Sequence, residues 1–508
     1  MASENKTIAK NTIYLYLRSF LMMAINLYSS RVILQALGVE DYGLFGAIGS
    51  IVAMFTIING SLSAGTSRFL TFELGKGDSD RLKKTFNASL TMHICMALFL
   101  FVLMETIGLW FVNSKMNIPE GRAFAANIVY QASVLCCMFS LTQVPYSATI
   151  ISHEKMDIYA YVGLAEAVFK LALIFVLLYV PFKDNLIAYA IIIASWSILL
   201  QLFYRFYCSR QFKETHLSFC KDKSVYKDML SYSLWDTIGA FCATGNSQGI
   251  NILINLFFGV TVNAARQVAY QVEGAINNLA NNFTTSVTPQ IVKSYAKGDK
   301  KRFFQLIYES GRYSYYLMFL IAFPVILEAD YILKIWLVEV PDYTVLFTRF
   351  VLSIALFRII VRSTINGVHA TGDVKTLNLT SGVYSVCTFL PIVYILFKVG
   401  LPVWTCFVVL AFNSVVCNYF EARSLYKREK FAILHYITYV YLHPIAVSIV
   451  AGIIPAIIVF TMKESFLRLV LTIIANTACT AICVYTLGIN HATRQKVNAF
   501  IISKLNLK

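Results

Sequence analysis

Apolar stretches of about 20 residues or more recur from one end of the chain to the other. An α-helix rises 1.5 Å per residue, so a stretch of this length crosses the roughly 30 Å hydrocarbon core of a bilayer. The alternation of apolar and polar residues that marks a transmembrane strand is absent. The pattern predicts an all-α integral membrane protein with about 14 transmembrane helices. The predicted segments are residues 11–37, 42–73, 85–112, 122–146, 157–180, 185–208, 228–258, 262–292, 303–328, 343–366, 376–397, 402–422, 434–461 and 467–489.

A group of turn and loop residues occurs twice along the chain, 221 positions apart. The repeated residues are Gly38, Val39, Lys76, Gly77, Asp78 and Arg81, which recur as Gly259, Val260, Lys297, Gly298, Asp299 and Arg302. The spacing predicts two pseudo-symmetric six-helix lobes followed by two extra C-terminal helices. Because six is an even number of crossings, both lobes enter the membrane from the same side, and we expect a central cavity between them. The predicted parts are an N-lobe (1–208), a cytoplasmic linker (209–227), a C-lobe (228–425) and a C-terminal part (426–508).

The charge of the chain is strongly positive and unevenly distributed. Lys and Arg number 43 against 27 Asp and Glu, a net charge of +16, although 58% of the residues are hydrophobic. The loops that follow even-numbered segments carry most of the cations, roughly 27 on one side of the membrane against about 6 on the other. This bias predicts that both termini lie in the cytoplasm. The positive charge therefore mainly sets the orientation of the chain in the membrane and adds a weak attraction to anionic lipid. We expect no nucleic-acid partner.

The motifs that mark enzymes and metal sites are missing from the sequence. The 11 cysteines and 7 histidines are scattered and have no disulfide or zinc spacing. The Gly-Lys-Gly-Asp run at 75–78 lacks the spacing of a nucleotide-binding loop. We therefore expect a protein that is not an enzyme, with no catalytic residue, no metal and no cofactor. Uphill transport would have to draw on a proton or sodium gradient, or on the substrate's own concentration difference.

Polar side chains at membrane depth indicate a transport path, because they are costly against lipid. Segment eight carries amides at three- and four-residue steps, which places them along one helical face, and segment seven contributes two more. The candidate substrate-binding amides are Asn251, Asn255, Asn277, Asn278 and Asn281. Polar side chains also hold membrane helices together, and this alternative stays open for each single residue. The whole set favours a water-filled cavity.

Cations outnumber anions within the predicted segments. The candidate substrate-binding cations are Arg18, Arg31, Arg266, Arg358 and Arg362. Arg358 and Arg362 are four residues apart and share a helical face. Arg358 lies roughly 22 Å along the helix from its outer end. A guanidinium group matches phosphate oxygens and stays charged at physiological pH, so the set indicates an anionic, phosphate-bearing substrate. For Arg31 and Arg266, extension of the side chain to the membrane interface remains an alternative.

Two acidic residues are candidates for gating and coupling. By the repeat offset, Asp236 lies at nearly the same height as Arg18, so we expect the two to pair across the lobes near the cytoplasmic mouth. Glu273 is near the middle of segment eight and has no obvious partner nearby in the sequence. An ionisable residue at this depth is a candidate for proton or sodium coupling.

The N-terminal region resembles the Wzx-type polysaccharide flippases. The residues that carry the resemblance are Asn11, Arg31, Leu37-Gly38, the Asp41-Tyr42-Gly43-Leu44-Phe45 turn, Ser67-Arg68-Phe69 and Gly77-Asp78. These flippases belong to the multidrug, oligosaccharidyl-lipid and polysaccharide exporter superfamily. The resemblance implies a V-shaped, two-lobed fold that works by alternating access in a bacterial inner membrane. It also implies the substrate, an undecaprenyl-diphosphate-linked oligosaccharide repeat unit moved for O-antigen, capsule or related glycan assembly, with a polysaccharide polymerase and glycosyltransferases as partners.

Two other transporters and one enzyme class stay open as alternatives. A cation-coupled drug antiporter of the MATE type is expected to have a carboxylate in its first helix, where this chain has Arg18 and Arg31. A lipid II flippase has a similar number of segments and a cationic cavity. A membrane-bound glycan polymerase or ligase is expected to carry a large outward loop, and no outward loop here exceeds about 20 residues. The sequence leaves the sugars, the coupling ion and the oligomeric state open.

Overall fold

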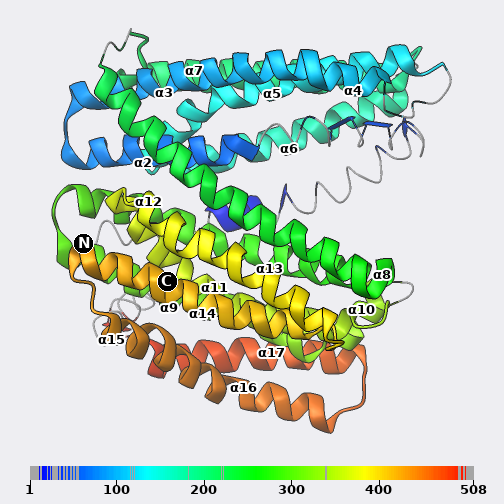
Figure 1. The fold of residues 1–508 in the computed structure, drawn as a ribbon, viewed down its shortest axis with the longest axis vertical. Coiled ribbons are helices and arrows are strands. Elements are labelled where there is room, and N and C mark those ends of the chain that lie inside the picture. The colour runs from blue at the N-terminus through cyan, green and yellow to red at the C-terminus, as the bar shows by residue number, and fades with distance from the viewer. Residues whose placement is uncertain are drawn as a thin grey trace, which may run out of the picture. The chain divides into compact units, whose positions relative to one another are not determined.

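The computed structural model describes residues 57–489, except 115, 117, 119–120, 181, 219, 221 and 338–339, together with scattered positions on either side of that range. Most of the first predicted segment, including Arg31, lies outside the described residues. Every regular element in the described part of the chain is a helix, as Figure 1 shows. Nine helical stretches among these residues are long and apolar enough to cross a membrane. The prediction of an all-α, multi-pass membrane protein is confirmed.

The helices occupy every predicted segment from the second onward. The α-helices are α2 (Ile57–Lys76), α3 (Ser79–Leu103), α4 (Leu109–Ser114), α5 (Ala123–Ser152), α6 (Met156–Tyr179), α7 (Asn185–Gln211), α8 (Lys223–Ala296), α9 (Lys300–Leu327), α10 (Ala329–Trp336), α11 (Thr344–Thr371), α12 (Val374–Leu377), α13 (Val383–Lys398), α14 (Thr405–Glu429), α15 (Ile433–Tyr436), α16 (His443–Thr461) and α17 (Phe466–Cys483). The π-helical segments are η1 (Met104–Gly108), η3 (Asn378–Gly382), η4 (Ile437–Leu442) and η5 (Val484–Gly488), and η2 (Lys213–Thr215) is a 3₁₀ turn. Predicted segments seven and eight both lie in α8, which is interrupted at Gly259 by non-helical backbone.

The repeat in the sequence is also a repeat of helices. Helices α3 and α9 begin at Ser79 and Lys300, and α5 and α11 begin at Ala123 and Thr344, so each pair is 221 residues apart. Gly77 and Gly298, at the same spacing, have φ angles of 77° and 75° and lie one and two residues after the ends of α2 and α8. A side chain is strained in this left-handed region, which explains why glycine occupies both turns.

The chain packs as two compact units. Unit 1 comprises Met1–Ala240, Thr288–Lys300 and Ala370–Lys375, and unit 2 comprises Phe241–Val287, Lys301–His369 and Thr376–Lys508. Helix α8 therefore gives its two ends to unit 1 and its middle to unit 2. The predicted division at residues 208, 227 and 425 follows the sequence repeat and stays a prediction.

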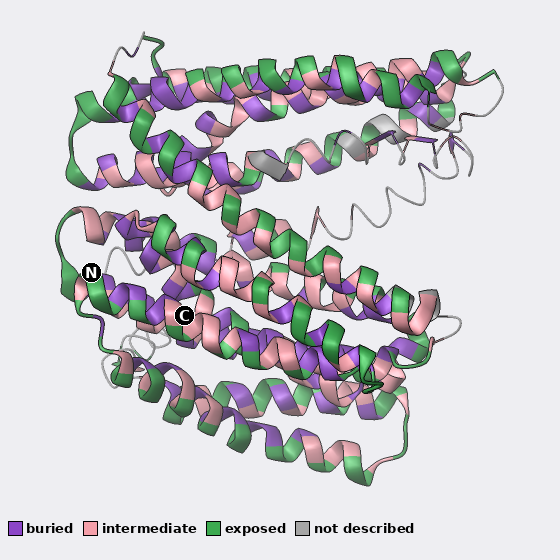
Figure 2. Cartoon of the chain, viewed as in Figure 1, coloured by how far each residue is buried: buried purple, intermediate pink, exposed green. Residues whose placement is uncertain are grey.

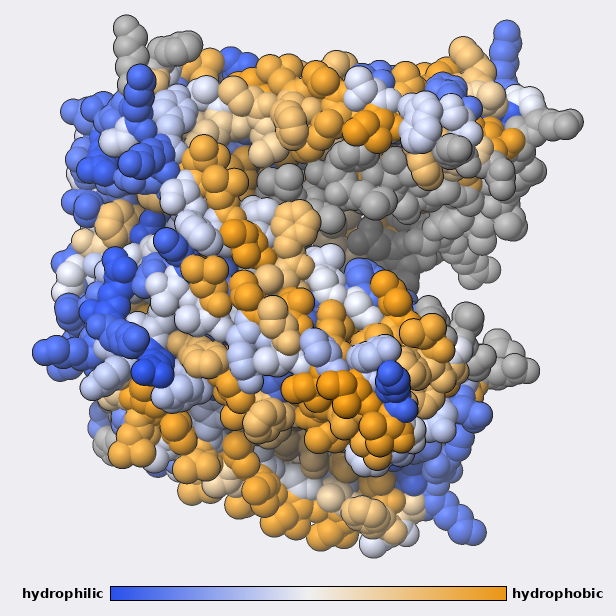
Figure 3. Space-filling model, viewed as in Figure 1, coloured by the Kyte–Doolittle hydropathy of each residue, from blue (hydrophilic) through white to orange (hydrophobic). Residues whose placement is uncertain are grey.

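Each unit has its own apolar core. In unit 1, α3, α5 and α7 contribute buried residues such as Leu100, Val129 and Leu186. In unit 2, α11 and α14 contribute Phe347 and Phe407, whose rings are 4.9 Å apart. Figure 2 shows exposed residues along the outer helices, and Figure 3 shows that many of these positions are hydrophobic. Such surfaces are typical of helices that face lipid.

A buried ion pair joins α17 to the end of α9 in unit 2. Glu328 is 0% exposed, and both of its carboxylate oxygens accept hydrogen bonds from the guanidinium group of Arg468, the shortest at 2.6 Å. Thr472 donates a third hydrogen bond to Glu328 at 3.1 Å. Removing one partner of such a pair leaves an uncompensated buried charge.

We expect Arg468→Ala to destabilise the protein by about 3 kcal/mol, because Glu328 then stays buried without its cation. Thermal unfolding of the detergent-solubilised protein measures this effect. Lys334→Ala is the matched control, since Lys334 and Glu464 form an exposed ion pair in the same region, with 59% and 44% of their side chains accessible. Exposed pairs contribute at most about 1 kcal/mol. Equal unfolding temperatures for the two variants would contradict the role of the buried pair.

Candidate functional site

A group of charged and polar side chains gathers inside unit 2, contributed by α8, α11 and α14. We call Glu273, Asn277, Arg358, Arg362 and Glu421 the charged cluster. Arg358 interacts electrostatically with Glu273 of α8, with Glu421 of α14 and with Arg362 one turn further along α11. Asn277, one turn after Glu273, donates a hydrogen bond to its carboxylate. The four-residue spacings on α8 and α11 place each pair on one helical face.

The accessible part of the charged cluster is cationic. Arg358 and Arg362 are exposed, whereas Glu273 is half-buried and Glu421 is buried. Arg362 keeps this accessibility although neighbouring residues surround part of its side chain. Charges in such surroundings are weakly screened and act strongly on a ligand. The arrangement therefore suits an anion that reaches the two guanidinium groups.

The polar face of α8 continues from the charged cluster along the helix. Asn278 is exposed and Asn281 is half-buried, and Thr285 donates a hydrogen bond to the backbone carbonyl of Asn281 at 2.9 Å. Asn277 and Asn281 thus lie one and two turns after Glu273, and Asn278 is the neighbour of Asn277. The structure brings together three of the five predicted amides and two of the five predicted arginines on α8 and α11.

Glu273 is less isolated than its sequence neighbours suggested. The sequence offered no obvious partner, but Asn277 of the next turn donates to Glu273, and Arg358 of α11 lies close enough to interact with it. The prediction overlooked Asn277 because it was counted as a substrate ligand. It overlooked Arg358 because a contact between distant helices has no signal in one sequence.

The sequence analysis missed Glu421. It fell at the predicted end of its segment, but α14 continues to Glu429, so Glu421 lies two turns inside the helix. Ser381 shares a hydrogen bond with Glu421, and nearby Asn418 donates one to the Tyr441 hydroxyl at 2.6 Å. A search for acidic residues facing the helix interior, rather than for the end of the apolar stretch, could have found it.

Arg266 and Asn251 form a separate pair across the Gly259 interruption in α8. Arg266 is only 4% exposed, donates a hydrogen bond to the Asn251 side chain and lies 4.4 Å from the centre of the Tyr270 ring. Asn251 also accepts a hydrogen bond from Gln267 at 3.3 Å. These contacts join the two halves of α8. The side chain of Asn255 lies outside the described residues.

The predicted gate residues Arg18 and Asp236 both belong to unit 1. The guanidinium of Arg18 lies 4.3 Å from the centre of the Tyr159 ring and packs against Gly163 of α6. Asp236, in the first part of α8, accepts a hydrogen bond from Ser61 of α2. These contacts give each residue a different neighbour, and their mutual pairing stays a prediction.

Helix α2 packs closely against both ends of α8 within unit 1, and we call this the α2–α8 contact. At the first end of α8, a Cβ atom on Gly65 would come within 2.8 Å of the Ser233 hydroxyl. At the last end, a Cβ atom on Gly75 would come within 2.8 Å of the Ala296 Cβ and 2.9 Å of the Lys293 Cα. Glycine is required where helix backbones approach this closely.

Each helix of the α2–α8 contact is also tied to another part of unit 1, α8 by an ion pair and α2 by a hydrogen bond to backbone. Glu154, in the α5–α6 turn with φ of 60°, accepts hydrogen bonds from Gln290 at 2.5 Å and from Lys293 at 2.6 Å. Arg68 of α2 donates to the carbonyl of Ala370 at 3.1 Å, and its guanidinium packs against Gly372. The sequence gave no sign of Glu154, because a single loop carboxylate resembles any solvated charge.

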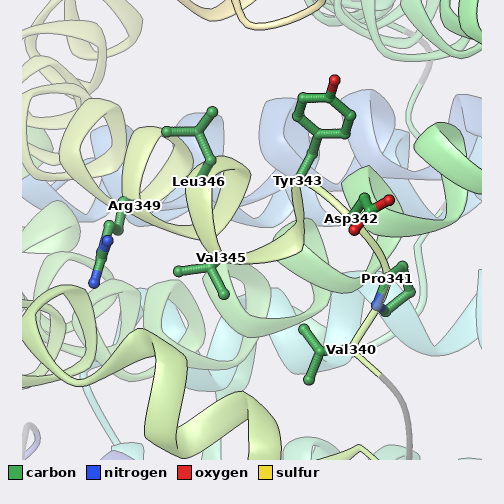
Figure 4. Close-up of a pocket in the computed structure, with 7 residues that line it drawn as sticks. All are labelled: Val340, Pro341, Asp342, Tyr343, Val345, Leu346 and Arg349. Carbon is green, nitrogen blue, oxygen red and sulfur yellow. The ribbon is translucent and has the colours of Figure 1, made fainter.

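A pocket of about 400 Å³ at the start of α11 has a different character. Figure 4 shows its two charged lining residues, Asp342 and Arg349, at opposite ends. Arg349 forms an ion pair with Asp330 at 2.7 Å and donates to the carbonyl of Ile326 at 3.2 Å. With its guanidinium engaged in this way, Arg349 serves the packing of α10 against α11 rather than an anion site.

Comparisons with solved structures show that the chain shares its fold with multi-pass membrane transporters. A MATE transporter in its bent conformation superposes with a TM-score of 0.72 at 12% identity, covering 85% of this chain and 96% of its own. An outward-facing multidrug-resistance MATE transporter of the MOP superfamily gives a TM-score of 0.70 at 12% identity, covering 85% of this chain and 96% of its own. A MOP superfamily transporter from Pyrococcus furiosus Vc1, described as having a binding pocket of reverse polarity, gives 0.67 at 12% identity, covering 85% and 96%.

The sequence identifies the family within this fold. The profile of the family described as polysaccharide biosynthesis protein matches residues 8–295, and the chain belongs to this family. The match confirms the resemblance to polysaccharide flippases of the same superfamily. No curated protein matches the chain at a significant level.

Proposed function

We propose that this protein flips undecaprenyl-diphosphate-linked oligosaccharide repeat units from the cytoplasmic to the periplasmic leaflet of a bacterial inner membrane. The observation that carries the proposal is the pair of accessible arginines, Arg358 and Arg362, inside a membrane transporter of a polysaccharide biosynthesis family. In this role the protein supplies repeat units for surface polysaccharide such as O-antigen or capsule. A polysaccharide polymerase and glycosyltransferases would act on the same lipid-linked chain.

The arginine pair has the chemistry that a diphosphate requires. The two residues are one helical turn apart, a rise of about 6 Å, so their guanidinium groups can each hold one phosphate group. Each guanidinium can donate two parallel hydrogen bonds to a phosphate. A lysine would offer only a point charge, without this fork of donors.

The polar face of α8 suits the sugars of the same substrate. Asn277, Asn278 and Asn281 carry amides that both donate and accept hydrogen bonds, as sugar hydroxyls do. They lie beside Glu273, which interacts with Arg358. A diphosphate on the arginines would therefore place the first sugars along α8, while the polyprenyl chain stays in the bilayer.

The carboxylates of the charged cluster suggest how ion coupling works. With no substrate bound, Glu273 and Glu421 balance the charge of Arg358. A diphosphate competes with them for the guanidinium, so its binding favours uptake of a proton or sodium ion at a released carboxylate. Release of the substrate on the far side returns Arg358 to its carboxylates.

The α2–α8 contact supplies a gate for alternating access. It lies at the end of the helices where the basic loops gather, which is the predicted cytoplasmic end. Separation of α2 from α8 would admit the head group, and closure would seal this side. The Glu154–Lys293 ion pair stabilises the closed form.

We expect Glu154→Lys to lower transport by about tenfold, because repulsion from Lys293 replaces an attraction in the closed form. The double variant Glu154→Lys/Lys293→Glu restores the pair and should recover most of the activity. Complementation of surface polysaccharide in cells lacking the protein measures both. Lys155→Ala, an exposed neighbour of Glu154, is the control and should be silent. If the double variant stays as inactive as the single one, Glu154 does not act through Lys293.

The function itself is tested in cells lacking the protein. Mass spectrometry of polyprenyl-linked saccharides, combined with their accessibility to an external probe in spheroplasts, should show complete repeat units accumulating on the cytoplasmic leaflet. Unchanged lipid-linked saccharides together with altered drug sensitivity would replace the flippase by a drug antiporter. Accumulation of lipid II instead would indicate a lipid II flippase.

A further inference from the structure

A second pocket in unit 2 is lined by residues that do not belong to the charged cluster. It has a volume of about 490 Å³ and is bounded by the first turns of α9 and by α15 with η4. Its lining residues are Lys301, Phe304, Gln305, Tyr308, Glu309, His435 and Tyr439. We call it the α9–α15 pocket. None of these residues belongs to the proposed transport path.

Aromatic rings form the walls of the α9–α15 pocket. The ring of Tyr308 lies 5.1 Å from His435 and 5.2 Å from Phe431, and His435 stacks on Tyr439 at 5.0 Å. Phe304 packs against Phe431 at 5.8 Å. Such rings, with an apolar body and a polar tip, favour the boundary between headgroups and acyl chains of a bilayer.

The mouth of the pocket is basic. Lys301 and His435 are both exposed, and the last turn and C-cap of α14, just before Phe431, carry Lys427, Arg428 and Lys430. Glu309 is the one carboxylate in the lining, and Gln305 donates a hydrogen bond to it at 2.8 Å. A mouth of this kind attracts anionic headgroups.

Behind the pocket lies a buried charge that the protein leaves unbalanced. Arg312 is 1% exposed, and its guanidinium carbon lies 4.0 Å from the centre of the Tyr439 ring. It donates to the carbonyl of Gly488 and lies beside the hydroxyl of Tyr316, but its Nε and one terminal nitrogen are within hydrogen-bond geometry of no acceptor among the described residues. No carboxylate in the described part of the chain forms an ion pair with it.

A charge buried without a partner is costly, and an anion close by would offset the cost. Tyr439 connects Arg312 to the α9–α15 pocket, because its ring contacts the guanidinium and also lines the pocket. Tyr439 and Gly488 both come from π-helical segments, η4 and η5. Such segments occur frequently at functional sites.

We infer that the α9–α15 pocket binds the phosphate of an anionic lipid headgroup from the adjacent leaflet. Lys301 and His435 hold the phosphate at the mouth, and Arg312 attracts it across Tyr439 from within. The aromatic walls take the glycerol and the first part of the acyl chains. This site is separate from the transport path, so the inference holds whichever molecule the protein transports.

The experiment measures lipid retention by native mass spectrometry, with the full-length protein released from nanodiscs of phosphatidylcholine and phosphatidylglycerol. We expect the wild-type protein to retain phosphatidylglycerol and Lys301→Ala to retain it about tenfold less. Lys300→Ala, an exposed cation on the preceding residue that does not line the pocket, should behave as the wild type. Equal retention by all three proteins would overturn the inference, as would equal retention of both lipids by the wild type.

A second variant tests the buried charge. Arg312→Met keeps roughly the volume of the side chain and removes its charge. This variant should also lower retention of phosphatidylglycerol, and thermal unfolding verifies that it is folded. Thermal stabilisation of the wild type is then compared between phosphatidylglycerol and inorganic phosphate. Stabilisation by the lipid alone supports the site, whereas equal stabilisation by inorganic phosphate would overturn its assignment to a lipid. Neither readout depends on transport, so a failure here is distinct from a failure of the proposed flippase activity.

Discussion

The double variant Arg358→Ala/Arg362→Ala is expected to lose about 99% of flippase activity. Each guanidinium donates charge-assisted hydrogen bonds worth about 1.5–3 kcal/mol, so removal of two of them reduces substrate binding about 100-fold or more. Complementation of surface polysaccharide and accumulation of cytoplasmic repeat units both report this loss. The corresponding lysine variants keep the charge but lack the planar guanidinium group that can donate two parallel hydrogen bonds, and they should retain intermediate activity.

Arg349→Ala is the matched control for the arginine pair. Arg349 lies on the same helix, α11, but its guanidinium is engaged by Asp330 and by the carbonyl of Ile326. We expect its removal to leave transport within about twofold of the wild type, since exposed ion pairs contribute little. Equal losses in the double variant and in Arg349→Ala would mean that the charge of α11 matters only for folding or insertion.

Gly75→Leu should abolish transport by preventing closure of the α2–α8 contact. A side chain at this position meets the backbone of Lys293 as well as Ala296, and a backbone atom cannot turn aside as a flexible side chain can. The variant should be held open at its basic end. A single cysteine at position 233, placed in an otherwise cysteine-free protein, should then react faster with a maleimide supplied from the cytoplasmic side.

Gly60→Leu is the control on the same helix. Gly60 is exposed, and a Cβ atom there meets nothing within 4 Å, so the larger side chain should be tolerated. The two variants make the same substitution in the same helix and differ in the surroundings of the glycine. If Gly75→Leu transports normally, close approach of α2 and α8 is not part of the transport cycle.

The fold was predictable because membrane insertion places a simple requirement on each helix. About 20 apolar residues are needed for each crossing, and that requirement is visible in the sequence. The turns were predictable where backbone geometry demands one residue type, as at Gly77 and Gly298 with their positive φ angles. The end of α14 was not predictable in this way, because a helix can continue beyond the apolar stretch when other helices cover its polar residues.

The candidate site was predictable only where its residues share one helix. Arg358 and Arg362 of α11 and the asparagines of α8 follow from helical periodicity. Glu154 depends on contacts between distant segments, which a single sequence does not encode in any local pattern, and Glu421 was missed because it fell at the predicted end of its segment. The position of Arg266 in the sequence indicated either a substrate ligand or a side chain at the membrane interface. In the structure Arg266 is buried against Asn251 and Tyr270, contacts that the sequence pattern did not reveal.

The central claim is tested most directly with purified protein in proteoliposomes that contain an undecaprenyl-diphosphate-linked repeat unit. Transfer of the saccharide between leaflets is followed by its accessibility to an added glycosidase. The account predicts rapid transfer with the wild-type protein and with Arg349→Ala, and no transfer above protein-free vesicles with Arg358→Ala/Arg362→Ala. Equal transfer by all three proteins, or none by the wild type under an imposed proton or sodium gradient, would contradict it.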